Sequence, residues 1–151
     1  IRIAVFANEG VSNPFRPARG YRDISRRVDE ILQETGLDRL ASANAGALSY
    51  GDVALLEIAL ALANRPRLLL LDEPICGMSP SETERTVERI TELARTIDVI
   101  LIEHDMEVVF KIADLITVMA QGRLLVQGTP DEVARNDKVQ EVYLGTPEEV
   151  E

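Results

Sequence analysis

The sequence is poor in the residues on which several kinds of site depend. Its 151 residues include one cysteine, Cys76, and one histidine, His104. A single cysteine provides no disulfide framework, which is typical of a protein in a reducing compartment. Because no second histidine or thiol partner stands out, Cys76 is interpreted as a small packing residue and not as a nucleophile. These shortages exclude a disulfide-stapled scaffold and disfavour thiol catalysis.

Long apolar runs and a basic surface are also absent. No run approaches the roughly 18 apolar residues that a membrane span requires, and no charged-then-apolar leader opens the chain. We therefore expect no direct membrane insertion. A net charge of -10 with scattered basic residues argues against a nucleic-acid partner. The 46% hydrophobic content is ordinary for one globular unit, or part of one, with a real core.

Charged and polar residues follow the apolar segments in a pattern that indicates phosphate chemistry. Four leucines, residues 68–71, lead directly into Asp72 and Glu73, as in a buried parallel strand that presents charge at its carboxyl end. Upstream, residues 49–52 open an apolar helix whose backbone N–H groups can face an anion. His104 follows a second apolar run. Together these features favour a site for nucleotide phosphates.

Local patterns predict alternating helices and strands along the chain. Ser79-Pro80-Ser81-Glu82 has the form of a capping box, which starts a helix linking two parallel strands. The helix from Ser49 is apolar almost all round, so we expect it to be largely buried. The further elements that we expect are a helix over 24–36 ending at Gly36, a strand over 98–103, a helix over 105–112, strands over 115–119 and 123–127 around a turn at 121–122, and C-terminal helices starting at capping boxes 129–132 and 146–149.

The order and spacing of these segments resemble the ATP-binding subunit of an ABC transporter. Residues 49–52 resemble the signature loop, 68–73 the Walker B strand, 76–79 the D-loop, and His104 the switch histidine. The residues within these motifs are most similar to those of branched-chain amino acid importers. The shared features are the Tyr in the signature, the Gly-Met-Ser-Pro D-loop and the segment Val-Gln-Glu-Val-Tyr-Leu-Gly near the end. The resemblance runs from about Ile24 to Gly145.

This resemblance implies an α/β fold of the P-loop NTPase type, a mostly parallel sheet flanked by helices, with part of a helical subdomain. Residues 1–64 would hold the signature loop and part of the helical subdomain, 65–128 the sheet core, and 129–151 the C-terminal helices. The phosphate-cradling loop Gly-x4-Gly-Lys is absent, since lysine occurs only at Lys111 and Lys138. We therefore expect the C-terminal part of a nucleotide-binding domain, with a natural truncation as the alternative.

The resemblance also implies roles for single residues. Asp72 would hold Mg2+ through water, Glu73 would direct the attacking water, and His104 would contact the γ-phosphate. Three further residues would belong to the D-loop: Gly77, Met78 and Ser79. Many members of the family carry an acidic residue at the position of Ser79. Four further residues would bind the γ-phosphate of ATP held by a second subunit: Ser49, Tyr50, Gly51 and Asp52. The plainer alternatives are solvated strand-end carboxylates, a structural histidine and an N-cap serine.

The function implied is that of an ATP- and Mg2+-dependent ATPase that powers import of branched-chain amino acids or similar small polar solutes. Its partners would be a second ATP-binding subunit, identical or different, and transmembrane permease subunits. It would sit peripherally on the cytoplasmic face of the inner membrane. Two alternatives remain from the residues alone: a non-transport ABC ATPase of DNA repair or translation, and a catalytically silent interaction domain.

Overall fold

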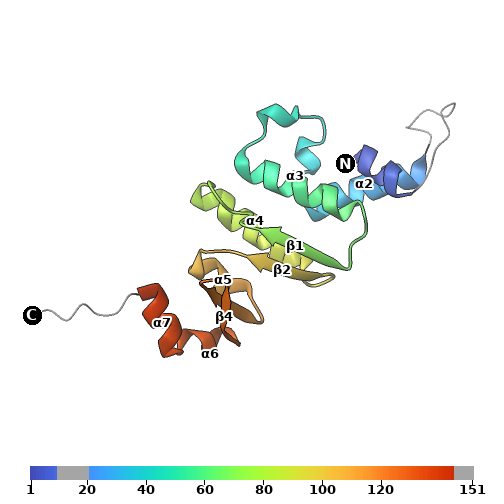
Figure 1. Ribbon diagram of the computed structural model, residues 1–151. Helices are drawn as coiled ribbons and strands as arrows, with labels where there is room; N and C mark the ends of the chain where they lie inside the picture. Colours follow the sequence, from blue (N-terminus) through green and yellow to red (C-terminus); the bar gives the residue numbers. More distant parts are fainter. Residues whose placement is uncertain (10–20, 145–151) are drawn as a thin grey trace, which may run out of the picture. The chain divides into compact units, whose positions relative to one another are not determined.

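The computed structural model describes residues 1–9 and 21–144 (Figure 1). These described residues fall into two compact units, one up to Ile102 and one from Glu103 onward. The first unit contains these elements: α1 (Arg2–Asn8), α2 (Arg22–Glu34), the 3-10 turns η2 (Asp38–Leu40) and η3 (Ala45–Ala47), α3 (Tyr50–Leu62), β1 (Leu68–Asp72), α4 (Pro80–Leu93) and β2 (Asp98–Ile102). The division of the chain into three parts, with boundaries after residues 64 and 128, stays a prediction.

Helix α2 has the amphipathic pattern and the ending that the sequence predicts. Ile24, Val28 and Ile31 are buried, and Gly36 follows the helix with φ of 68°. A left-handed residue after a helix turns the chain away and is usually glycine, because a Cβ would be strained there. The buried Thr35 hydroxyl donates to the Ile31 carbonyl at 2.8 Å, so the last turn has its polar groups paired.

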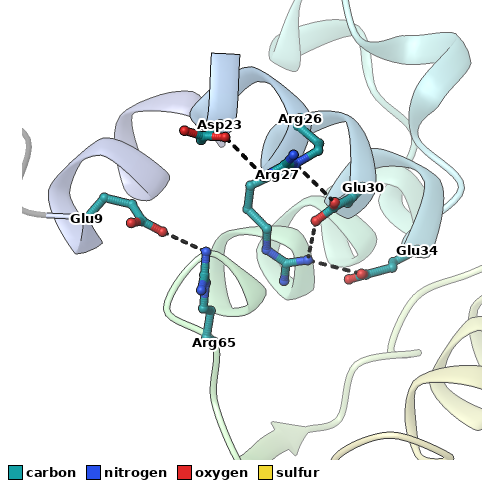
Figure 2. A network of polar contacts seen from close by, with 7 residues as sticks. All are labelled: Glu9, Asp23, Arg26, Arg27, Glu30, Glu34 and Arg65. Carbon is teal, nitrogen blue, oxygen red and sulfur yellow. Dashed lines mark hydrogen bonds and ion pairs between the residues drawn. The ribbon is translucent and has the colours of Figure 1, made fainter. Parts of the chain in front are cut away.

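Ion pairs run along α2, and a further one joins Arg65, after α3, to Glu9 (Figure 2). Arg27 Nη1 lies 3.1 Å from Glu34 and 3.4 Å from Glu30, and its Nη2 donates to the Leu62 carbonyl at 3.3 Å. The Arg27 side chain is only 18% exposed, so these contacts are partly shielded from water. Arg27 therefore links α2 to the last residue of α3, shortly before the chain enters β1.

Strands β1 and β2 form a parallel pair in which Leu68 lies opposite Asp98 and Asp72 opposite Ile102. Helix α4 connects them, as the strand–helix–strand pattern predicts (Figure 1). Leu69 and Leu71 are buried, whereas Leu70 is 68% exposed. Alternate residues of a strand point to opposite faces, so one face of this pair belongs to the core and the other is bare in the described residues.

The prediction that α3 is largely buried is only partly right. Leu55, Ile58 and Leu62 are buried, but Val53 and Leu60 are 38% and 40% exposed. The helix packs against α2 and α4, which cover one side of it. On the other side of α3, no described element covers the apolar side chains, so they stay partly exposed to water.

The second unit contains α5 (Met106–Ile112), β3 (Ile116–Ala120), β4 (Arg123–Gly128), α6 (Pro130–Ala134) and α7 (Asp137–Leu144). Strands β3 and β4 form an antiparallel hairpin. Its turn residues Gln121 and Gly122 both have positive φ, as a type I′ hairpin turn requires. Val118 and Val133 belong to the small core of this unit. The capping box predicted at Thr146 lies outside the described residues.

None of the helices within residues 1–9 and 21–144 is long and apolar enough to cross a membrane.

Candidate functional site

The end of β1 places two carboxylates side by side in different backbone conformations. Asp72 is the last residue of the strand and is exposed. Glu73 follows with φ of 45°, and its N–H donates to the Ile102 carbonyl at 2.9 Å. A non-glycine residue at positive φ costs about 1 to 3 kcal/mol and persists where the surrounding structure holds it, often at functional sites. The backbone of Glu73 therefore differs from the extended backbone of Asp72, and the fold holds it in that conformation.

The loop after Glu73 carries the predicted D-loop residues into α4. Gly77 has φ of 75°, which suits the glycine at this position. Met78 N–H donates to the Ile75 carbonyl at 3.3 Å, and its sulfur lies 3.5 Å from the Thr86 hydroxyl. Ser79 is the N-cap of α4. The loop therefore leads in a short, hydrogen-bonded path from the carboxylates to a helix start.

The predicted signature residues form the start of α3. Ser49 is the N-cap, and its hydroxyl oxygen accepts from the Asp52 N–H at 3.3 Å while lying 3.0 Å from the Asp52 carboxylate. The side chain of Asp52 also forms an ion pair with Arg85 of α4. Tyr50 is 76% exposed. The N-cap role of Ser49 is confirmed, and the charge of Asp52 has a cationic partner.

Sequence reasoning assigned Glu82 only to a capping box, but the structure gives it a second set of contacts. Its Oε2 accepts from the Ser79 N–H at 3.0 Å and the Ser79 hydroxyl at 2.6 Å. Its Oε1 accepts from the Gly51 N–H at 3.3 Å, 31 residues away in the signature loop. Hydrogen bonds from Ser79, and then from Ser49 and Gly51, lower the pKa of Glu82 to about 2. No local sequence pattern indicates the contact with Gly51.

Part of the predicted site lies around one hollow in the first unit. The hollow has a volume of about 340 Å3 and lies between α3 and the end of β1. Tyr50 lines it together with Asp72, Glu73 and Met78. The structure thus brings together the start of the signature helix, the strand-end carboxylates and the D-loop.

His104 belongs to the second unit and is described within it. It precedes α5, and its side chain is 71% exposed. The imidazole Nδ1 lies 3.8 Å from the Glu103 carboxylate, and the His104 N–H donates to the same carboxylate at 3.3 Å. Its predicted approach to the γ-phosphate stays a prediction.

The end of β1 offers carboxylate oxygen, a ligand type that Mg2+ takes in proteins. Within the described ranges, no group of three or more His, Cys, Asp or Glu side chains could enclose a metal. Mg2+ keeps several waters and commonly takes one or two carboxylates plus substrate phosphates. Exposed Asp72, at the end of β1, has the chemistry for that single contact.

Two family models match the chain. The model described as ABC transporter matches residues 2–76, which include the signature residues and the β1 carboxylates. The model of the branched-chain amino acid ATP-binding cassette transporter matches residues 123–149. The two matches follow one another along the chain.

Curated relatives point the same way. The chain is 40% identical over 129 residues to the high-affinity branched-chain amino acid transport ATP-binding protein BraF of Pseudomonas aeruginosa, covering 84% of the chain and 51% of that protein. It is 42% identical over 121 residues to LivG of Escherichia coli K12, a protein of the same description, covering 79% and 48%. The chain spans about half the length of the curated relatives it matches.

Solved structures share the fold. One is an ATP-binding cassette of an ABC transporter in its ADP conformation, with a TM-score of 0.75, 26% identity, and coverage of 96% of this chain and 61% of that one. Another is cbiO1 from Clostridium perfringens, part of the ABC transporter complex cbiONQ, with a TM-score of 0.72, 31% identity and coverage of 95% and 58%.

Proposed function

Because the chain belongs to the ABC transporter family of ATP-binding proteins, we propose that it is part of an ATPase subunit that powers import of branched-chain amino acids or similar small polar solutes. The observation that carries the ATPase part of this proposal is the position of Glu73. It is held at positive φ beside Asp72, at the hollow that the start of α3 also lines. Two carboxylates with different backbone directions can take separate tasks in phosphoryl transfer.

Asp72 and Glu73 divide the chemistry. Asp72 would hold Mg2+ through water, and the metal would supply positive charge to the β- and γ-phosphates. Glu73 would accept a hydrogen bond from the attacking water and orient it toward the γ-phosphorus. The hydrogen bond from the Glu73 N–H to the Ile102 carbonyl holds the Glu73 backbone at the end of the strand pair.

The signature residues would serve ATP that is held by a second subunit. Ser49 and Gly51 offer a hydroxyl and an N–H at the positive end of the α3 dipole, where an anion is favoured. The D-loop residues Gly77, Met78 and Ser79 would lie at the same subunit boundary. The proposed partners are a second ATP-binding subunit and membrane permease subunits, with the protein peripheral to the cytoplasmic face. The description of cbiO1 as part of the ABC transporter complex cbiONQ supports an assembly of several subunits, and the names of BraF and LivG as transport ATP-binding proteins support a role in transport.

The proposal is tested with Glu73→Gln in the full-length protein. We expect hydrolysis to be nearly abolished while ATP binding persists, so that dimers with trapped nucleotide accumulate. A suitable control is Glu57→Gln, because Glu57 lines the same hollow on α3 without lying at the strand end. Single-turnover hydrolysis and size-exclusion chromatography with ATP provide the readouts. Near-normal turnover of Glu73→Gln would contradict the assignment.

His104→Ala supplies a second, independent check on the site. We expect lower turnover, because the imidazole would donate a hydrogen bond to the γ-phosphate. Turnover equal to that of the parent protein would remove His104 from the site.

A further inference from the structure

The Glu82 carboxylate receives hydrogen bonds from two loops at once. Ser79, at the end of the D-loop, donates its N–H and hydroxyl to Oε2, while Gly51 of the signature loop donates its N–H to Oε1. Gly51 is buried, and a Cβ added there would lie 3.1 Å from Glu82 Cβ. The absence of a side chain at Gly51 is what allows this close approach.

Capping α4 does not require the contact with Gly51. The helix start at Thr129 has the same Thr/Ser-Pro-x-Glu form, and Glu132 completes its capping box with the N–H and hydroxyl of Thr129. Both the causes that lower the Glu132 pKa come from Thr129. The bond between Glu82 and Gly51 is therefore additional to the cap and can be given up without losing it.

The Gly51 N–H is also one of the donors at the start of α3 that have no partner within the helix, where an anion would bind. An anionic oxygen of Glu82 already occupies it. The neighbouring Asp52 is paired with Arg85, whereas Glu82 makes no ion pair with any residue in the described ranges. Glu82 is thus a carboxylate at the signature loop whose charge is held by hydrogen-bond donors and by no ion pair among the described residues.

We propose that Glu82 is a further residue of the nucleotide site: its carboxylate holds the signature-loop donors in the absence of nucleotide and is exchanged for the γ-phosphate of ATP when two subunits close. This inference rests on the proposed ATPase function. On exchange, Gly51 passes from carboxylate to phosphate, and Glu82 keeps its two bonds to Ser79. Glu82 therefore sets the affinity of the signature loop for ATP, because the bond to Gly51 must be broken first.

The test compares the ATP-driven dimerisation of variants of the full-length protein. All of them carry Glu73→Gln, so that ATP hydrolysis does not dissociate the dimer. Glu82→Gln is added to this parent, and Glu132→Gln in the same parent is the matched control. Size-exclusion chromatography over a range of ATP concentrations gives the half-saturating value. We expect Glu82→Gln to lower it by roughly two- to fivefold, the size of an exposed charge interaction. The gain should shrink as salt rises, and Glu132→Gln should change nothing.

A second variant protects the test against misfolding. Glu82→Asp keeps a charge at the start of α4 but is one methylene shorter, so it reaches Gly51 less well and should also lower the half-saturating value. Melting temperatures show which variants are folded. A folded Glu82 variant with an unchanged or higher half-saturating ATP concentration would overturn the proposal for Glu82 alone. A parent that forms no dimers with ATP would overturn the proposed function and this inference with it.

Discussion

The chain starts two helices with the same four-residue pattern, and the two glutamates that complete the patterns have different surroundings. Glu132 bonds to Thr129 and so serves its own helix. Glu82 bonds to Ser79 in the same way and also to Gly51, from a segment 31 residues away. One motif thus acts locally in the second unit and joins two loops in the first.

The electrostatics follow the hydrogen bonds. The pKa of Glu132 lies below its usual value because Thr129 donates to the carboxylate. Donors from Ser79, Ser49 and Gly51 lower the pKa of Glu82 to about 2. A carboxylate that collects donors from several segments stays ionised where others are protonated. The comparison teaches that a capping motif read from sequence specifies the cap and leaves further partners open.

The largest effect is expected from Gly51→Val. The new branched side chain would begin 3.1 Å from Glu82 Cβ and would force α3 and α4 apart. We expect a loss of about 1 to 3 kcal/mol in the free energy of unfolding. Leu60→Val, at an exposed position of the same helix, is the control for helix propensity. Urea unfolding followed by circular dichroism measures both, and equal stabilities would show that the two helices do not approach closely at Gly51.

The next effect separates the two caps. Ser79→Ala and Thr129→Ala each remove a hydroxyl that bonds to the capping glutamate. Loss of an N-cap side chain costs about 0.5 to 2 kcal/mol. We expect Ser79→Ala to lie at the upper end, because freeing Glu82 also loosens Gly51. Hydrogen exchange should then show faster exchange in the first turn of α3 for Ser79→Ala. Unchanged exchange there would mean that the caps are equivalent.

The pH dependence of stability should differ at the two glutamates. The folded pKa of Glu82, about 2, lies below its usual value of 4.5, so ionised Glu82 stabilises the fold. This contribution is complete above pH 4.5 and is lost as the pH falls toward 2. Glu82→Gln should therefore flatten the acid side of the stability curve, and Glu132→Gln should flatten it less. Urea unfolding at several pH values decides, and identical curves for the two variants would contradict the difference.

The smallest effect is expected at Asp52. Its charge lies in the signature loop, so Asp52→Gln should tighten ATP-driven dimerisation, most clearly at low salt. Arg85 already offsets that charge, and we expect a smaller gain than for Glu82→Gln. If the contact between Asp52 and Ser49 matters more, the melting temperature should fall instead, with no gain in dimerisation. Weaker dimerisation with intact folding would contradict the repulsion.

Features that depend on neighbouring residues could be predicted from the sequence. The parallel strands, the glycine that ends α2, the hairpin turn at Gln121 and the N-caps at Ser49 and Ser79 are confirmed. Each follows from apolar spacing or from the φ values and hydrogen bonds that a residue allows. The comparisons also confirm the family and the fold class.

Features that depend on distant segments could not be predicted. Helix α1 has no capping signal and is held by contacts with α2, including Arg2 Nη1 to the Ser25 hydroxyl at 3.0 Å. The positive φ of Glu73 is fixed by a bond to Ile102 on another strand. The second role of Glu82 depends on Gly51. In each case the partner is remote in the sequence, so no local pattern carries the information.

NMR at neutral pH tests most directly whether the Gly51 N–H donates a hydrogen bond to the Glu82 carboxylate. A hydrogen bond to a carboxylate moves an amide proton downfield, so the Gly51 resonance should shift upfield in Glu82→Ala and stay in place in Glu132→Ala. A Gly51 resonance at the same position in Glu82→Ala as in the parent would show that the carboxylate does not occupy the signature loop.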